Sequence, residues 1–232
     1  MDAFCAASIA NSTPVKVRLP ILSATQIVEL HDSFTREWHI DPNPPDPLLL
    51  NPPLATTLGV WAGMIAAHHR ANFDLWHIED EARTPGASDA VLAGVKRRID
   101  STNQRRNDLA EQLDRTLLAD LAPRGLPNPD APLHSEPPGL MIDRLSILAL
   151  KIFHTREEME RPEAPLGHAQ RNGERLAILL EQRSDLAHCL ARLWQETLAG
   201  TRRFKLYRQL KMYNDPSLNP AIYGNLGPQQ RR

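Results

Sequence analysis

Four carboxylates on two successive predicted helices have residue types and a spacing that suit a magnesium site. Glu111 and Asp114 form an ExxD pair, and the adjacent Glu79 and Asp80 lie on the preceding helix. Mg²⁺ prefers hard oxygen ligands and keeps several of its waters, so carboxylates from two helices would suit it. ExxD is frequent in helices and no ExxE precedes it here. The pattern therefore supports metal-dependent hydrolysis only as an alternative.

A second group of polar residues follows one face of the helix that carries Glu79. Asn72, Trp76, Glu79 and Arg83 recur at the spacing of one helical face. One interpretation is that they point into a polar, ligand-binding cavity beside Trp76. The other is a helix emerging from the core, with Glu79 and Arg83 forming a surface pair worth about 0.2–0.5 kcal/mol.

Arg106 interrupts the apolar stripe of the next predicted helix and is flanked by Asn103 and Asn107. An unpaired buried charge costs several kcal/mol, so a buried arginine needs a partner. We expect Arg106 to be largely buried and to pair with Glu79 or Asp143 in a polar interior. The alternative is a solvated flank from which Arg106 extends along its own aliphatic stem.

Asp143 lies in the most apolar helical segment of the chain, on the same face as His154. A plain ion pair with the adjacent Arg144 is one interpretation. The other is that Asp143 and His154 belong to the same polar interior as Arg106. A lone histidine such as His154 is more often packed or hydrogen-bonded than a ligand or a base.

The C-terminal region concentrates basic residues among aromatic ones. The spacing of Phe204, Tyr207, Arg208 and Lys211 predicts a short basic helix over residues 201–213. Basic and aromatic side chains on one face suit a phosphate or a sugar phosphate, with Arg208 and Lys211 as ligands. The alternative is a basic helix that balances acidic faces elsewhere.

The prolines show which elements must position these residues. All 20 prolines fall outside the windows 54–84, 86–122, 139–161 and 166–215, and a proline inside a helix costs about 3 kcal/mol. A shorter helix is expected over residues 25–38, capped by Ser23 or Thr25. The sequence predicts an all-α bundle of five or six helices, with the helix 139–161 at its centre and proline-rich connectors at 39–53 and 123–138. We expect a variable segment over 1–22, one helical domain over 23–215 and an irregular tail over 216–232.

Composition excludes several classes of protein. The chain has 232 residues and a formal net charge of −1, which argues against wholesale nucleic-acid binding. No apolar run reaches the roughly 18 residues of a membrane span, and the first residues are unlike a secretory signal. Cys5 and Cys189 make neither a disulfide framework nor a zinc site. We expect a cytoplasmic protein without a nucleophile elbow, P-loop, dinucleotide glycine motif, HExxH or CxxC.

Four ordered blocks carry a family resemblance that extends over about residues 25–223. They are NFDLWHIEDEAR (72–83), KRRIDSTNQRRNDLAEQLD (96–114), LHSEPPGLMIDRLSILALKIFHTREE (133–158) and RRFKLYRQLKMYNDPSLNP (202–220). The chain resembles a bacterial domain-of-unknown-function family, number 4254, and IDRLSILALK also resembles a block of another uncharacterised helical family. The resemblance implies a place in surface-polysaccharide or lipopolysaccharide assembly, beside glycosyltransferases. It implies no catalytic role for any residue.

Three functions remain open on the sequence. The first is an accessory protein that binds a phosphorylated or nucleotide-linked sugar, or a partner glycosyltransferase. The second is a Mg²⁺-dependent enzyme similar to the all-α nucleotide pyrophosphohydrolases. The third is a helical scaffold without a small-molecule site.

Overall fold

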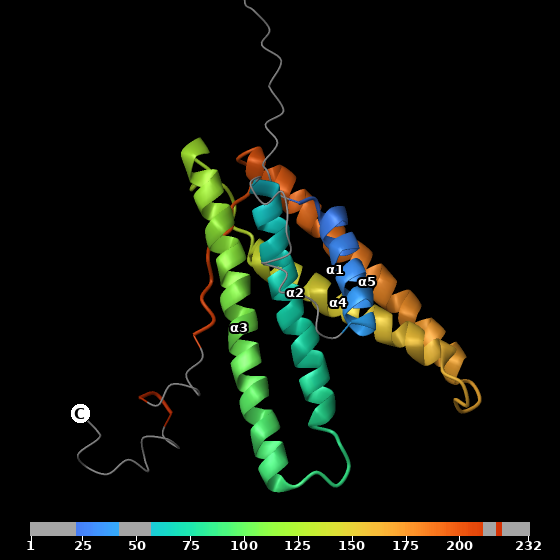
Figure 1. Ribbon diagram of the computed structural model, residues 1–232. Coiled ribbons are helices and arrows are strands. Elements are labelled where there is room, and N and C mark those ends of the chain that lie inside the picture. The colour runs from blue at the N-terminus through green and yellow to red at the C-terminus, as the bar shows by residue number, and fades with distance from the viewer. Residues whose placement is uncertain (1–21, 42–56, 211–216, 220–232) are drawn as a thin grey trace, which may run out of the picture.

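A computed structural model of the chain describes residues 22–41, 57–210 and 217–219. These residues form five α-helices: α1 (Ala24–Ile40), α2 (Thr57–Glu81), α3 (Asp89–Leu121), α4 (Pro138–Glu160) and α5 (His168–Leu198) (Figure 1). A 3-10 turn, η1 (Ala122–Arg124), follows α3. The described part of the chain contains no strand beyond an isolated bridge between Leu133 and Arg203. The predicted all-α class is confirmed.

The helix boundaries follow the prolines and the capping residues. Each long proline-free window contains one long helix. Ser23 caps α1 in a capping box with Gln26, in which each side chain accepts a hydrogen bond from the other residue's backbone N–H. Proline is tolerated in the first helical turn, because its missing N–H has no partner there, and α4 begins at Pro138.

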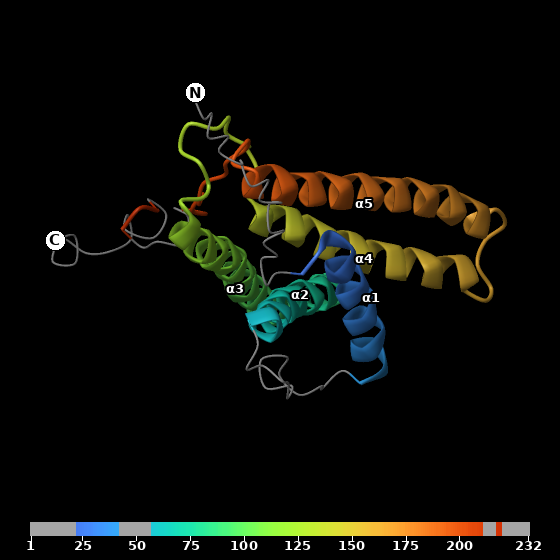
Figure 2. The same ribbon diagram turned by 90° about the horizontal axis from the view of Figure 1, so that it is seen from above.

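The long helices form two pairs that cross each other. α2 lies beside α3, and α4 lies beside α5 (Figures 1 and 2). α4 packs against each of the other four α-helices. Its side chains Leu145, Leu148 and Ile152 are buried, so the central position predicted for this helix is confirmed.

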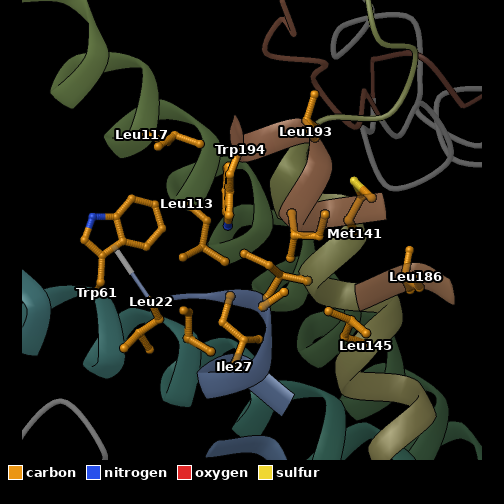
Figure 3. Packing of buried hydrophobic residues seen from close by; sticks show 14 of the residues in the cluster. Leu22, Ile27, Trp61, Leu113, Leu117, Met141, Leu145, Leu186, Leu193 and Trp194 are labelled. Carbon is orange, nitrogen blue, oxygen red and sulfur yellow. The ribbon is translucent and has the colours of Figure 1, made fainter. Parts of the chain in front are cut away.

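The main hydrophobic core fills the space where the two pairs and α1 meet (Figure 3). Fully burying a side chain of this size stabilises the fold by about 1.5–3 kcal/mol relative to leaving it exposed. The labelled members are Leu22, Ile27, Trp61, Leu113, Leu117, Met141, Leu145, Leu186, Leu193 and Trp194. The core draws on every long helix, and this fixes the position of α2 and α3 against α4.

The predicted basic helix over 201–213 is wrong for the residues that the structure describes. Gly200 adopts the left-handed conformation at the end of α5, with φ of 71°. The Gly200 and Thr201 N–H groups bond back to Thr197 and Glu196, as in a Schellman motif. The chain then continues without helix to residue 210, and Arg203 pairs with the backbone of Pro132 and His134. Phe204 is buried, so its spacing from Tyr207 reflects packing of an extended segment rather than a helical face.

Several sequence predictions fall outside the described residues. The connector expected at 39–53 begins in the last turn of α1 and its C-cap Asp41, and residues 42–53 are not described. The same holds for residues 1–21 of the expected N-terminal segment and for the tail except residues 217–219. No helix in the described part of the chain is long and apolar enough to cross a membrane.

The beginning of α4 makes a close contact with α3. An added Cβ at Gly139 would meet the Ala110 carbonyl oxygen far inside van der Waals contact, and Asp114 Oδ2 at 2.9 Å. The Gly139 N–H also donates to Asp114 Oδ1 over 2.6 Å. Asp114 thus caps α4 from a neighbouring helix, where the N-cap Pro137 has no side-chain hydrogen bond to offer.

We expect Gly139→Ala to lower the free energy of unfolding by about 1–3 kcal/mol, because a backbone carbonyl cannot move aside cheaply. Gly94→Ala is the matched control, since Gly94 also lies in a helix and a Cβ there meets nothing within 4 Å. The control should gain about 0.5–1 kcal/mol. Urea unfolding of both variants measures the difference, and equal shifts in one direction would contradict the close contact.

Candidate functional site

A cavity of 380 Å³ lies between the C-terminal half of α2 and the facing sides of α3 and α4. Six residues that the sequence selected line it, together with three apolar ones. The polar and aromatic members are Asn72, Trp76, Glu79, Asp80, Arg83 and Arg106; the apolar members are Leu75, Ile147 and Leu150. The polar face of α2 and the arginine of α3 therefore lie on the same cavity.

Asp143 lies behind the cavity wall and binds three side chains from two other helices, α2 and α3. Arg106 donates to it in a two-pronged arrangement, from Nε to Oδ1 over 2.7 Å and from Nη2 to Oδ2 over 2.5 Å. Asn72 Nδ2 donates to Oδ1 over 3.0 Å, and His68 Nε2 lies 3.0 Å from the same oxygen. The exposed fraction is 8% for the Asp143 side chain and 22% for Arg106. The predicted burial and pairing of Arg106 are confirmed, with Asp143 rather than Glu79 as its partner.

The electrostatics keep this pair charged. Burial alone would raise the pKa of Asp143, but the hydrogen bonds and charges of Arg106 and His68 outweigh it and hold the pKa well below its ordinary value. The hydrogen bond to Asp143 raises the pKa of Arg106 in return, against the effect of burial. Arg144, the alternative partner, binds Glu136 at the surface instead.

A chain of hydrogen bonds leads from the cavity into the core. Asn72 Nδ2 donates to Ser146 Oγ over 3.0 Å, and Ser146 Oγ lies 2.7 Å from His69 Nδ1. Thr35 Oγ1 donates to the His31 carbonyl over 2.8 Å and lies 2.9 Å from His69 Nε2. A hydroxyl has a single hydrogen, so Thr35 accepts from His69 Nε2–H, and His69 Nδ1 accepts from Ser146. This direction requires a neutral His69, and burial lowers its pKa to about 3.

His31, His69 and Ser146 belong to this network, although no sequence pattern predicted their role. His31 stacks on His69 with ring centroids 4.5 Å apart, and burial lowers the pKa of His31 as well. The available signal was the spacing on α2, where His68 and His69 precede Asn72 by one helical turn within an apolar stretch. Thr35 lies on α1, and the spacing of residues along the sequence could not show that it contacts His69 of α2.

The mouth of the cavity is more exposed than its floor. Arg83 Nη2 lies 3.4 Å from Glu79 Oε2, and their side chains are 68% and 42% exposed. The surface pair that the spacing predicted thus exists, and the same two side chains line the cavity. Such an exposed pair contributes little to stability, which leaves both side chains available to a ligand.

Trp76 forms the wall between this cavity and a second one of 420 Å³ on the other side, next to α5. Its ring stacks on His154, with centroids 4.8 Å apart and planes 8° apart. Burial lowers the pKa of His154. Because Trp76 of α2 stacks on His154 of α4, packing from α4 helps to hold this aromatic wall in place.

The remaining predicted ligands lie apart from the cavity. Asn103 Oδ1 accepts a long hydrogen bond of 3.4 Å from Arg106 Nη1, and Asn107 is half-buried on α3. Neither of them lines the cavity, and neither does the exposed Arg208. Lys211 lies outside the described residues.

The structure does not bring Glu79, Asp80, Glu111 and Asp114 together. Contacts from Arg98 to Glu81 and from Trp61 to Asp120 fix the antiparallel register of α2 and α3. Residue 80 then faces about residue 100, so Glu111 lies about eleven residues further along α3, or roughly 16 Å at 1.5 Å per residue. Among the described residues these four carboxylates form no cluster of potential metal ligands.

Glu111 and Asp114 have structural partners instead. Glu111 accepts hydrogen bonds from the Gln209 N–H and from Arg115, and Asp114 caps α4 through Gly139. Burial raises the pKa of Asp114 to about 7, although the Gly139 hydrogen bond acts in the opposite direction. The ExxD spacing is therefore explained by the contacts of α3 with α4 and with the segment after α5.

Comparison with known proteins gives a family match over the region that contains the cavity. The family model described as "Protein of unknown function (DUF4254)" matches residues 62–206. This range includes every residue that lines the cavity. No curated protein matches the chain, and no solved structure matches it either.

We expect Arg106→Ala to lower the free energy of unfolding by about 3–5 kcal/mol, because it leaves the buried Asp143 carboxylate without its charged partner. Arg105→Ala removes an exposed arginine from the same turn of α3 and serves as the control. Urea midpoints with constant slopes give the comparison. Identical midpoints for the two variants would show that Asp143 does not depend on Arg106.

Asp114→Asn should become more stable relative to the wild type as pH rises from 5 to 8. The pKa of Asp114 is raised from 3.8 to about 7 in the folded state, so the folded chain holds a proton that the unfolded chain has released. Wild-type stability therefore falls as pH rises through this window. The amide cannot ionise and still accepts from Gly139.

The measurement is the free energy of unfolding of both proteins at several pH values, with the exposed Asp108→Asn as a control on the same helix. A constant difference between Asp114→Asn and the wild type would contradict a raised pKa at this position.

Proposed function

The chain belongs to the DUF4254 family of proteins of unknown function, and we propose that it binds a phosphorylated sugar, free or nucleotide-linked, in the cavity between α2, α3 and α4. The observation that carries this proposal is the meeting of an aromatic wall, two carboxylates and two arginines on one cavity. The resemblance to families associated with polysaccharide assembly supports a role as an accessory protein of bacterial surface-polysaccharide or lipopolysaccharide assembly, in the cytoplasm.

The size of the cavity favours a single glycosyl group as the enclosed part. Ligand cavities typically measure about 300–1,000 Å³, and this one has a volume of 380 Å³. It is at the lower end of that range, so a nucleotide attached to the sugar would extend outwards past Arg83 and Glu79. An exposed guanidinium at the mouth suits the phosphate, because its N–H groups match phosphate oxygens in pairs.

The chemistry of the wall fits sugar hydroxyls. Glu79 and Asp80 offer acceptors and the Asn72 amide adds a polar group, while Trp76 presents an aromatic face. Arg106 is held by Asp143 through two hydrogen bonds, so its charge is already balanced. The phosphate is therefore assigned to Arg83, and Arg106 acts as a fixed part of the floor.

The other functions receive less support. The magnesium enzyme needs carboxylates that converge, and α3 holds Glu111 far from Glu79. The basic C-terminal segment is partly occupied, since Arg202 binds Glu196 and Arg203 donates to the Ala131 carbonyl. Among the described residues, no particular surface favours a direct contact with a glycosyltransferase.

We expect a hexose 1-phosphate and its nucleotide diphosphate ester to bind the chain and raise its melting temperature. The free nucleotide and inorganic phosphate should bind more weakly, because neither fills the cavity beside Trp76. Ligand at 100 times Kd would stabilise the fold by about 2.7 kcal/mol. Calorimetric titration in the presence of a chelator, followed by Trp fluorescence, measures the affinities.

Two variants test the assignment within the cavity. Trp76→Leu should abolish binding of both sugar ligands, and Arg83→Gln should remove the preference for the phosphorylated sugar. Arg97→Gln, an exposed arginine on α3, is the matched control and should bind as the wild type does. Equal affinity for the free nucleotide and its sugar ester, or an unchanged affinity in Trp76→Leu, would overturn the proposal.

A further inference from the structure

Three histidines from three different helices meet on the side of Trp76 away from the cavity floor. His39 lies in the last turn of α1, His77 lies on α2 and His154 lies on α4. One ring nitrogen of each is within 4.8 Å of one ring nitrogen of both others. Among the described residues, no other group of three potential metal ligands lies this close together.

Hydrogen bonds determine which nitrogen of each ring carries the proton. His39 Nδ1 lies 2.6 Å from the Thr35 carbonyl oxygen, and His77 Nδ1 lies 2.9 Å from that of Phe73. A carbonyl can only accept, so Nδ1 is the protonated nitrogen in both rings. In a neutral ring, the lone pair is then on Nε2.

His154 follows the same pattern with a carboxylate. Its Nδ1 lies 2.7 Å from Glu157 Oε2. An ionised carboxylate oxygen can only accept a hydrogen bond, so Nδ1 of His154 carries the proton. The Nε2 atoms of His39 and His154 are buried and have no hydrogen-bond partner in the described structure. A buried polar atom without a hydrogen-bond partner destabilises the fold. A cation shared by these lone pairs would remove that cost.

We propose that His39, His77 and His154 bind a divalent transition-metal ion through their Nε2 atoms, with Zn²⁺ as the fitting probe. Imidazole nitrogen is a preferred ligand of zinc, copper and nickel. Metal-bound histidines almost always donate their other N–H to a carbonyl or a carboxylate. All three rings already have such a partner.

The spacing of the rings allows coordination after a small closure. Zn–N distances of about 2.0–2.1 Å place tetrahedral ligands roughly 3.3 Å apart. One nitrogen of each ring already lies within 4.8 Å of one nitrogen of both other rings, so the rings are close enough to share an ion once their Nε2 atoms turn towards it. The ring centroids are 5.2 Å apart for His39 and His77, and 5.0 Å for His39 and His154. The centroids of the third pair, His77 and His154, are 5.9 Å apart, so coordination requires these side chains to move closer together.

Aromatic packing holds these rings in place before any ion arrives. Phe153 stacks on His39 with centroids 4.1 Å apart, Phe73 packs on His77 at 4.3 Å, and Trp76 stacks on His154. Three protein ligands leave a fourth tetrahedral position for water or a small ligand. The 420 Å³ cavity that His154 lines offers room for such a ligand next to the site.

This site is separate from the proposed sugar cavity, and its test is independent. The full untagged chain is dialysed against chelator and titrated with Zn²⁺ by calorimetry, with bound metal counted by elemental analysis. We expect one Zn²⁺ per chain, a raised melting temperature and X-ray absorption that shows three imidazole ligands. An absence of binding, or a metal held by other ligands, would overturn the proposal.

The variants distinguish this site from adventitious binding to surface histidines. His39→Gln, His77→Gln and His154→Gln should each abolish stoichiometric binding. Glu157→Gln, which changes only a positioning residue, should weaken Zn²⁺ affinity by about 10–100-fold. His188→Gln is the matched control, because His188 is exposed on α5 and its Nδ1 contacts the Ser184 carbonyl at 2.8 Å in the same way.

The control should bind Zn²⁺ as the wild type does, and circular dichroism of the metal-free proteins checks their folding. If one histidine variant fails to fold, Glu157→Gln and the absorption spectrum of the wild type still decide. Binding that survives the loss of both His39 and His77 would contradict the site. The sugar-binding measurements are made with chelator present, so neither outcome of the Zn²⁺ titration changes their interpretation.

Discussion

The Asp143 carboxylate is the constraint on which the rest of the structure depends. It lies on α4, which packs against all four other α-helices, and its side chain is 8% exposed. A carboxylate in such a place needs a counter-charge and hydrogen bonds, since an unpaired buried charge costs several kcal/mol. Arg106 supplies the charge from α3, while Asn72 and His68 approach from α2. The three helices that enclose the cavity are thus fixed to one another at its floor.

This ion pair also determines what the cavity can bind. Because both prongs of the Arg106 guanidinium are directed at Asp143, the floor presents a balanced charge in a fixed orientation. The other charged side chains that line the cavity are at its mouth, where Arg83 and Glu79 form an exposed pair beside Asp80. A ligand with hydroxyl groups at its inner end and a phosphate at its outer end matches that gradient. Below the floor, the neutral His69 continues the hydrogen bonds towards α1 without adding charge to the interior.

The sequence predicted the parts of this structure that follow from local rules. Proline-free windows located the long helices, because proline is excluded from helix interiors. The position of Arg106 in an apolar stripe predicted a buried ion pair, since burial and charge together demand a partner. Local rules did not predict the features that depend on contacts between segments far apart in the sequence. The register of α2 against α3 separates Glu79 from Glu111, and the extended segment at Phe204 follows its pairing with residues 132–134. The meeting of His39, His77 and His154 depends on the crossing of three helices, which no spacing within one helix expresses.

α1 connects the two chemically distinct regions of the molecule, although it lies outside the 62–206 range of the family match. Thr35 ends the hydrogen-bond chain that starts at Asn72, and its carbonyl oxygen binds His39 Nδ1 one turn later. Trp76 makes a second connection, because it lines the cavity between α2, α3 and α4 and stacks on His154. Any movement of α1 that draws His39 towards His154 therefore acts on the stacked Trp76 ring and on the Thr35–His69 hydrogen bond at the same time. The two regions thus share contacts with packed side chains on α1 and α2.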